Sequence, residues 1–167
     1  AAICDAVMVG VAKRLEKGGA DFLVMPCNSL HIFIEEILKS VHIPVLSIAE
    51  ETVAFLQQKR VKEVGVLATS ATIQKNIYRS HLEKFGIQQV LPNEDQQKRI
   101  NQFISRLVLS KHNEKDKKEL MEIIEQFAQK GIKTIILACT DLQLLTPKHP
   151  SLNIYDTMKI LADATVR

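Results

Sequence analysis

Two stretches of the sequence share one pattern: Gly19-Ala-Asp-Phe-Leu-Val-Met-Pro-Cys27-Asn-Ser-Leu30 and Gly131-Ile-Lys-Thr-Ile-Ile-Leu-Ala-Cys139-Thr-Asp-Leu142. Each has a glycine that can end a helix, a short apolar run, a cysteine and small polar residues, with eight positions from glycine to cysteine. A short apolar run of this kind is typical of a buried parallel strand, and small polar residues after it can cap a helix. The repeat therefore predicts two related α/β lobes, each with one cysteine at the end of a strand.

The rest of the chain alternates in the same way. Apolar spacing predicts a first helix over 5–17, with Val7, Val11 and Leu15 on one face. We expect further helices at 30–40, 49–58, 71–85, 94–109 and 115–130 and at the end of the chain, and strands at 22–25, 44–48, 64–67, 135–137 and 154–155, with one more ending at 91–92. This order predicts an α/β fold with parallel sheets flanked by helices. We expect the first lobe to comprise residues 1–47 and 153–167, the second lobe residues 48–152, and the active site to lie between them.

The repeat also predicts an incomplete first lobe. The strand at Val64 begins 75 residues before Cys139, whereas only 26 residues precede Cys27. Its counterpart would lie about 48 residues upstream of Ala1, and the chain begins without methionine. We therefore expect a missing N-terminal segment, and with it an open sheet edge or an uncovered apolar face.

Composition excludes several classes of protein. The net charge is +3, and the basic cluster Lys115, Lys117 and Lys118 is interleaved with acidic residues, as on a solvated helix start. Nothing here favours a nucleic-acid partner. No apolar run reaches the roughly 18 residues of a membrane span, so no membrane partner is expected. Three widely spaced cysteines fit a reducing compartment, so we expect a cytoplasmic location.

The two repeated cysteines carry the candidate chemistry. The carboxyl ends of parallel strands form the ligand-binding edge of an open sheet, and a following helix N-terminus favours thiolate and can hold a carboxylate. Two such thiols facing each other could remove a proton from one face of a carbon and return one to the other. The alternative is that each is an ordinary buried cysteine, as we expect for Cys4, which has no repeated context. Zinc is disfavoured, since neither Cys27 nor Cys139 has a Cys or His partner at zinc-site spacing.

At these residues the chain resembles the aspartate/glutamate racemase superfamily, and most closely its aspartate racemase branch. The matching segments are 25–31 (Met-Pro-Cys-Asn-Ser-Leu-His), 64–72 (Val-Gly-Val-Leu-Ala-Thr-Ser-Ala-Thr), 137–142 (Leu-Ala-Cys-Thr-Asp-Leu) and 156–157 (Asp-Thr). The resemblance implies two pseudo-symmetric α/β domains with the active site between them, and no pyridoxal phosphate or metal. It further implies a homodimer and Cys27 and Cys139 as the two catalytic bases.

The resemblance also implies a set of substrate ligands: Asn28, Ser29, Thr69, Thr72, Thr140 and, across a variable stretch, Lys111. Thr69 and Thr72 can equally be turn and cap residues, and Lys111 an ordinary surface lysine. His31 could share a helix face with Cys27, although a satisfied histidine beside the helix start is the simpler role. Ser29 replaces the usual threonine of the family but keeps the hydroxyl. Asp141 stands where aspartate racemases usually have Glu and glutamate racemases His.

These features predict an isomerase, a cofactor-independent racemase of a small acidic amino acid. Aspartate is the first candidate and glutamate the second. Two alternatives stay open: a related cysteine-dependent isomerase of the same superfamily, and an inactive two-lobed binding protein. Exchange of the substrate α-hydrogen with solvent would separate a racemase from a binder. With the first lobe incomplete, we expect this chain alone to lack useful racemase activity.

Overall fold

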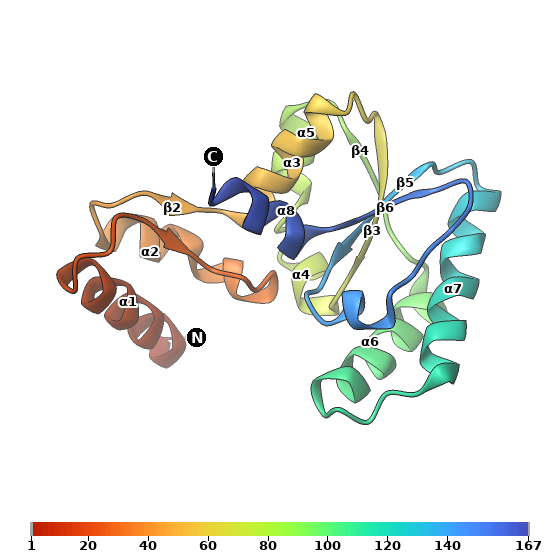
Figure 1. The fold of residues 1–167 in the computed structure, drawn as a ribbon, viewed down its shortest axis with the longest axis horizontal. Coiled ribbons are helices and arrows are strands. Elements are labelled where there is room, and N and C mark those ends of the chain that lie inside the picture. The colour runs from red at the N-terminus through yellow and green to blue at the C-terminus, as the bar shows by residue number, and fades with distance from the viewer. Residues whose placement is uncertain (1, 167) are drawn as a thin grey trace.

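Two parallel sheets organise the chain. The structure is a computed structural model that describes the backbone of residues 2–166 and the side chains of residues 6–166. In one sheet β1 (Leu23–Val24) pairs with β2 (Val45–Leu46). In the other, the strand order is β4-β3-β5-β6, with β3 spanning Glu63–Ala68, β4 Gln88–Val90, β5 Thr134–Ala138 and β6 Asn153–Asp156. All pairs are parallel, and the sheets lie in two separate lobes (Figure 1). The predicted α/β class is confirmed.

The first lobe is small and packs its helices on the two-stranded sheet. It contains α1 (Ala2–Lys17), the 3₁₀ helix η1 (Ser29–Phe33) and α2 (Ile34–Ser40). Its buried core consists of Ala12, Leu23, Met25, Phe33, Ile37 and Val41. The apolar face of the first helix, which includes Val7 (57% exposed) and Leu15 (50% exposed), faces solvent. The neighbouring face with Met8 and Ala12 packs on the core instead.

The second lobe covers both faces of its sheet. Along β3 the side chains alternate, as a strand buried on both faces requires: Val64 and Val66 pack on one side and Leu67 on the other. Helices α3 (Ile48–Gln58) and α5 (Arg79–Lys84) cover the first side. Helices α6 (Glu94–Val108) and α7 (Glu114–Gln129) cover the second. This is the layered arrangement that opens a sheet's carboxyl edge to a ligand.

The packing on the second side explains one glycine. A Cβ on Gly65 would lie 2.7 Å from Cδ1 of Phe127, so only glycine lets α7 approach β3 this closely. Helices α6 and α7 both begin at capping boxes, made by Asn93 with Gln96 and by Asn113 with Asp116. These caps place the two helix starts within one residue of the predicted positions.

The helix predicted over 71–85 is broken in two. Helix α4 (Ser70–Gln74) ends where Asn76 adopts a left-handed conformation with φ of 53°, and α5 starts at Arg79. The amide of Ile77 donates to the carbonyl of Thr72 and closes the first piece. Asparagine tolerates this conformation better than most residues, so the apolar spacing alone did not reveal the break. The turn carries Tyr78 into the interior, where it is 1% exposed.

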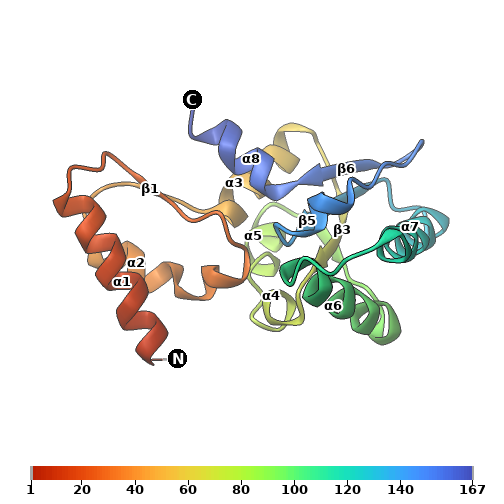
Figure 2. The same cartoon turned by 60° about the horizontal axis from the view of Figure 1, so that its bottom comes forward.

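The end of the chain lies differently from the predicted division. Residues 153–167 were expected with the first lobe, but β6 pairs with β5 and α8 (Thr157–Ala164) packs against α3 (Figures 1 and 2). The repeat explains this placement. Strand β2 follows the Cys27 strand and pairs with it, just as β6 follows the Cys139 strand and pairs with it. The predicted assignment of the strand at 153–156 to the first lobe is therefore wrong.

Among residues 2–166, no helix combines the length and apolar character needed to cross a membrane.

Candidate functional site

The two repeated cysteines occupy equivalent positions in the two sheets. Cys27 comes three residues after β1 and Cys139 directly follows β5, so both sit beyond carboxyl ends of parallel strands. Cys27 is partly exposed, whereas Cys139 is only 6% exposed. Asn28, next to Cys27, donates to the Thr157 hydroxyl at 3.1 Å, and that hydroxyl donates at 2.9 Å to the carbonyl of Leu137, two residues before Cys139. The fold therefore brings together, from opposite lobes, the two thiols that the repeat singled out.

Burial decides the protonation of Cys139. It raises the pKa of this thiol to about 11, and the nearby charges of Asp141 and Cys27 act in the same direction. The backbone amides of Asp141 and Leu142 oppose the shift but are outweighed. The helix that follows is a single 3₁₀ turn, η2 (Leu142–Leu145), and it starts three residues later. The predicted lowering of the thiol pKa by a helix N-terminus is therefore wrong for Cys139, which is a thiol at neutral pH.

Asp141 gives this thiol a partner. The Cys139 Sγ–H donates to Oδ2 of Asp141 at 3.8 Å, within reach of a weak sulfur hydrogen bond. Asp141 is half-buried at the start of η2 and makes no capping bond to that helix. Its carboxylate is thus free to accept this hydrogen bond and to orient the Sγ–H.

Three hydroxyls join the lobes beside the cysteines. The Ser29 hydroxyl lies 3.2 Å from that of Thr69 and 3.4 Å from that of Thr72, and the two threonine hydroxyls are 3.0 Å apart. Thr69 also caps α4 by accepting from the amide of Thr72 at 3.2 Å. The turn-and-cap role is therefore present in Thr69. The same contacts still bring three hydroxyl groups together, that of Ser29 from the first lobe and those of Thr69 and Thr72 from the second.

Asn28 is held in a buried network between the lobes. Its Nδ2 donates to the Thr157 hydroxyl at 3.1 Å, and its Oδ1 accepts from the hydroxyl of Tyr78. Thr157 in turn donates to the carbonyl of Leu137 at 2.9 Å, in the Cys139 strand. Asn28 is 2% exposed and makes no side-chain cap on η1. Most of the hydrogen-bonding groups of the Asn28 side chain are therefore used in contacts between the lobes. Tyr78 was not anticipated, because its position appeared as one more helical residue.

His31 has the satisfied role expected of it. Its Nδ1 lies 2.8 Å from the carbonyl of Cys27, and its Nε2 accepts from the amide of Ile48 at 2.9 Å. These two bonds require the neutral tautomer with hydrogen on Nδ1. Burial lowers the pKa of His31, which keeps it in that form. His31 thus ties the backbone of Cys27 to the first turn of α3.

The remaining predicted residues are less engaged. Thr140 is half-buried directly after Cys139. Lys111 is exposed in the loop between α6 and α7, and within the described residues its side chain forms no ion pair. The backbone of Cys4 lies in α1, but its side chain is outside the described residues.

The sequence matches known proteins along nearly its whole length. The model of the Asp/Glu/Hydantoin racemase family matches residues 1–165. The chain is 35% identical over 156 residues to the broad specificity amino-acid racemase RacX of Bacillus subtilis, covering 93% of this chain and 67% of RacX. It is 34% identical over 162 residues to the glutamate racemase of Persephonella marina, covering 90% of this chain and 59% of that enzyme.

Solved structures show the same fold. An aspartate racemase homologue from Pyrococcus horikoshii superimposes with a TM-score of 0.82 at 26% identity, covering 98% of this chain and 74% of the other. The chain thus spans about three fifths to three quarters of the length of these three proteins.

Proposed function

The chain belongs to the Asp/Glu/Hydantoin racemase family, and on that premise we propose that it racemises a small acidic amino acid, with Cys27 and Cys139 as the acid/base pair. One observation carries the proposal. Two copies of one strand–cysteine unit, one from each lobe, meet through Asn28 and Thr157, whose hydroxyl bonds to the carbonyl two residues before Cys139. Inversion at the α-carbon needs proton transfer on two opposite faces, and two equivalent groups facing each other supply it.

The proposed proton path begins with Cys139 as the acid. The thiol carries its proton at neutral pH, because burial raises its pKa to about 11. In one direction the Cys27 thiolate would remove the α-hydrogen, and Cys139 would deliver its proton to the other face. In the reverse direction the roles exchange: Cys139, left as the thiolate by the forward step, would remove the α-hydrogen, and Cys27 would deliver its proton to the other face. We assign Asp141, 3.8 Å from the Cys139 sulfur, the positioning role of orienting the Sγ–H.

Substrate recognition is proposed at the hydroxyls between the lobes. Ser29, Thr69 and Thr72 offer donors whose hydrogen bonds to one another can be exchanged for bonds to a carboxylate. Thr140 adds a hydroxyl beside Cys139. Asn28 contributes mainly by holding the lobes together, since its side chain is bonded to Tyr78 and Thr157. Lys111 is proposed to meet the side-chain carboxylate of the substrate only through movement of its exposed loop.

The substrate proposal rests on the relatives. The Pyrococcus horikoshii protein is an aspartate racemase homologue, the Persephonella marina enzyme is a glutamate racemase, and RacX is of broad specificity. We propose aspartate first and glutamate second. We further propose a cytoplasmic homodimer that needs neither pyridoxal phosphate nor a metal.

Solvent exchange tests the activity. The full gene product that carries this chain is incubated in D₂O with L-aspartate, D-aspartate or either glutamate enantiomer, and the α-position is followed by ¹H NMR with chiral analysis. The proposal expects α-deuterium in both enantiomers, because each thiol exchanges its proton with solvent. Ligand binding without α-exchange of any of the four amino acids would show a binding protein instead.

A further inference from the structure

A cavity lies at the edge of the four-stranded sheet opposite Cys139. It has a volume of about 460 Å³, in the range of small-molecule sites, and is lined by the amino ends of three strands, through Glu63, Thr134 and Asn153. Strand β5 runs from Thr134 at this cavity to Ala138, next to Cys139. Five steps along a strand put the two sites about 16 Å apart. The cavity is therefore distinct from the cysteine site.

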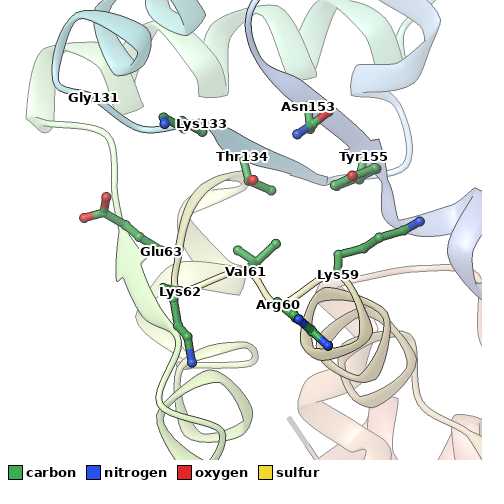
Figure 3. Close-up of a pocket in the computed structure, with 10 residues that line it drawn as sticks. All are labelled: Lys59, Arg60, Val61, Lys62, Glu63, Gly131, Lys133, Thr134, Asn153 and Tyr155. Carbon is green, nitrogen blue, oxygen red and sulfur yellow. The ribbon is translucent and has the colours of Figure 1, made fainter.

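The cavity carries an excess of positive charge. Figure 3 shows Val61, Thr134 and Tyr155 near its centre and charged side chains around it. The four cations around it are Lys59, Arg60, Lys62 and Lys133, against the single carboxylate of Glu63. Within residues 6–166, none of these five groups takes part in an ion pair. Long, unpaired side chains of this kind can turn toward a bound anion.

The partial negative charges at two helix ends offset only part of the positive charge around the cavity. Helices α3 and α7 end at the cavity, next to Lys59 and Gly131, and a helix C-terminus carries about half a negative charge. The two termini together offset about one cation, and Glu63 offsets another. About two positive charges remain, which suits a doubly charged anion.

Arg60 strengthens this inference. It adopts a left-handed conformation (φ 56°) just after α3. Its amide donates to the carbonyl of Gln57, and the amide of Val61 donates to the carbonyl of Leu56. The same pair of bonds closes α1, α4, α5, α6 and α7, and there the left-handed residue is uncharged: Gly19, Asn76, Gly86, Ser110 or Gly131. A non-glycine residue costs about 1–2 kcal/mol in this conformation. The chain thus keeps a cation at the cavity where glycine would be the more stable choice.

Polar groups complete the lining. Thr134 places a hydroxyl, Asn153 an amide and Tyr155 a phenol around the same space (Figure 3). Within the described residues none of these three side chains is hydrogen-bonded to another side chain. They are therefore free to bond to a ligand. From the charge, the size and these donors, we propose that this cavity binds a small dianion, either a phosphate or a dicarboxylate.

Calorimetric titration tests the proposal without reference to racemase activity. The full gene product that carries this chain is titrated at low ionic strength with inorganic phosphate and, separately, with succinate, and the tighter of the two identifies the source of the dianion. We expect saturable binding that weakens as salt is added. Arg60→Gly and Lys133→Gln should each weaken it about tenfold, the usual size of one charge-assisted hydrogen bond.

Two matched controls isolate the effect. Ser110→Gly replaces the left-handed residue that closes α6 by the same bonds, and Lys39→Gln removes an exposed cation of the first lobe. Both should bind like the unaltered chain. Arg60→Gly should also fold, because glycine prefers this conformation. The proposal is overturned if neither dianion binds saturably, if Arg60→Gly and Lys133→Gln bind normally, or if a control weakens binding as much.

Discussion

Removal of one hydroxyl, by Tyr78→Phe, should measurably loosen the contact between the lobes. The Tyr78 hydroxyl donates to Oδ1 of Asn28, and burial raises the pKa of Tyr78, so the donor hydrogen is present throughout the usable pH range. Thr157 cannot replace this donor. Its hydroxyl lies 3.5 Å from Oδ1, and its single hydrogen is engaged with the carbonyl of Leu137 at 2.9 Å. The substitution therefore leaves a buried amide oxygen without a partner.

The structure sets the size of the effect. Asn28 and Tyr78 are 2% and 1% exposed, so water cannot substitute easily. A buried acceptor left unsatisfied costs about 1–3 kcal/mol. For a chain of this length that lowers the melting temperature by roughly 2–4 °C per kcal/mol. Urea unfolding should thus show a free energy of unfolding lower by about 2 kcal/mol, and differential scanning calorimetry a melting temperature lower by roughly 4–8 °C.

Tyr155→Phe is the matched control. Tyr155 is half-buried, its ring packs edge-on against Phe55 at 4.8 Å, and within the described residues its hydroxyl forms no side-chain hydrogen bond. Its loss should change stability by no more than about 0.5 kcal/mol. The reasoning is refuted if Tyr78→Phe melts with the unaltered chain, or if Tyr155→Phe loses as much.

Two further predictions concern titration. Burial lowers the pKa of His31 from its ordinary value of 6.5, so its contribution to stability is complete above about pH 6.5 and is lost as the pH falls further, because the unfolded chain takes up the proton first. His31→Gln should flatten the pH dependence of urea unfolding between pH 8 and 5; an unchanged dependence would count against this assignment. Alkylation of Cys139 by iodoacetamide, followed by mass spectrometry with an acidic amino acid as protectant, should be slow at pH 7.5 and rise about tenfold per pH unit toward pH 11. A rate that levels off below pH 9 would show that burial does not control this thiol.

The sequence predicted the features that depend on local pattern. The glycine-to-cysteine repeat indicated the two lobes, and the apolar runs located β3 and β5 to within one residue, because a strand buried on both faces must be apolar throughout. The break at Asn76 escaped prediction since it contains neither glycine nor proline. The assignment of the strand at 153–156 to the first lobe was wrong, although the repeat itself placed a further strand after each cysteine strand.

The features that escaped prediction at the site depend on contacts between distant residues. Asn28 is 50 residues from Tyr78 and 129 from Thr157, and no local pattern joins them. The pKa of Cys139 was predicted in the wrong direction, because the helix that follows is visible in the sequence whereas the burial of the sulfur is a property of the packed core. The sequence pattern therefore placed Cys139 correctly at the end of its strand but predicted a lowered pKa where burial raises it.

The central claim, that Cys27 and Cys139 act as a pair, is tested most directly by replacing each with serine in the full gene product. The α-deuterium exchange and the chiral composition of L- and D-aspartate are then measured in D₂O. A serine hydroxyl without an activating partner is far too weak a base, so the account predicts that Cys27→Ser and Cys139→Ser each abolish racemisation of both enantiomers. Cys27→Ala and Cys139→Ala should behave alike, and circular dichroism should show that the variants remain folded. Near-normal racemisation by a folded variant that lacks either sulfur would contradict the two-thiol mechanism.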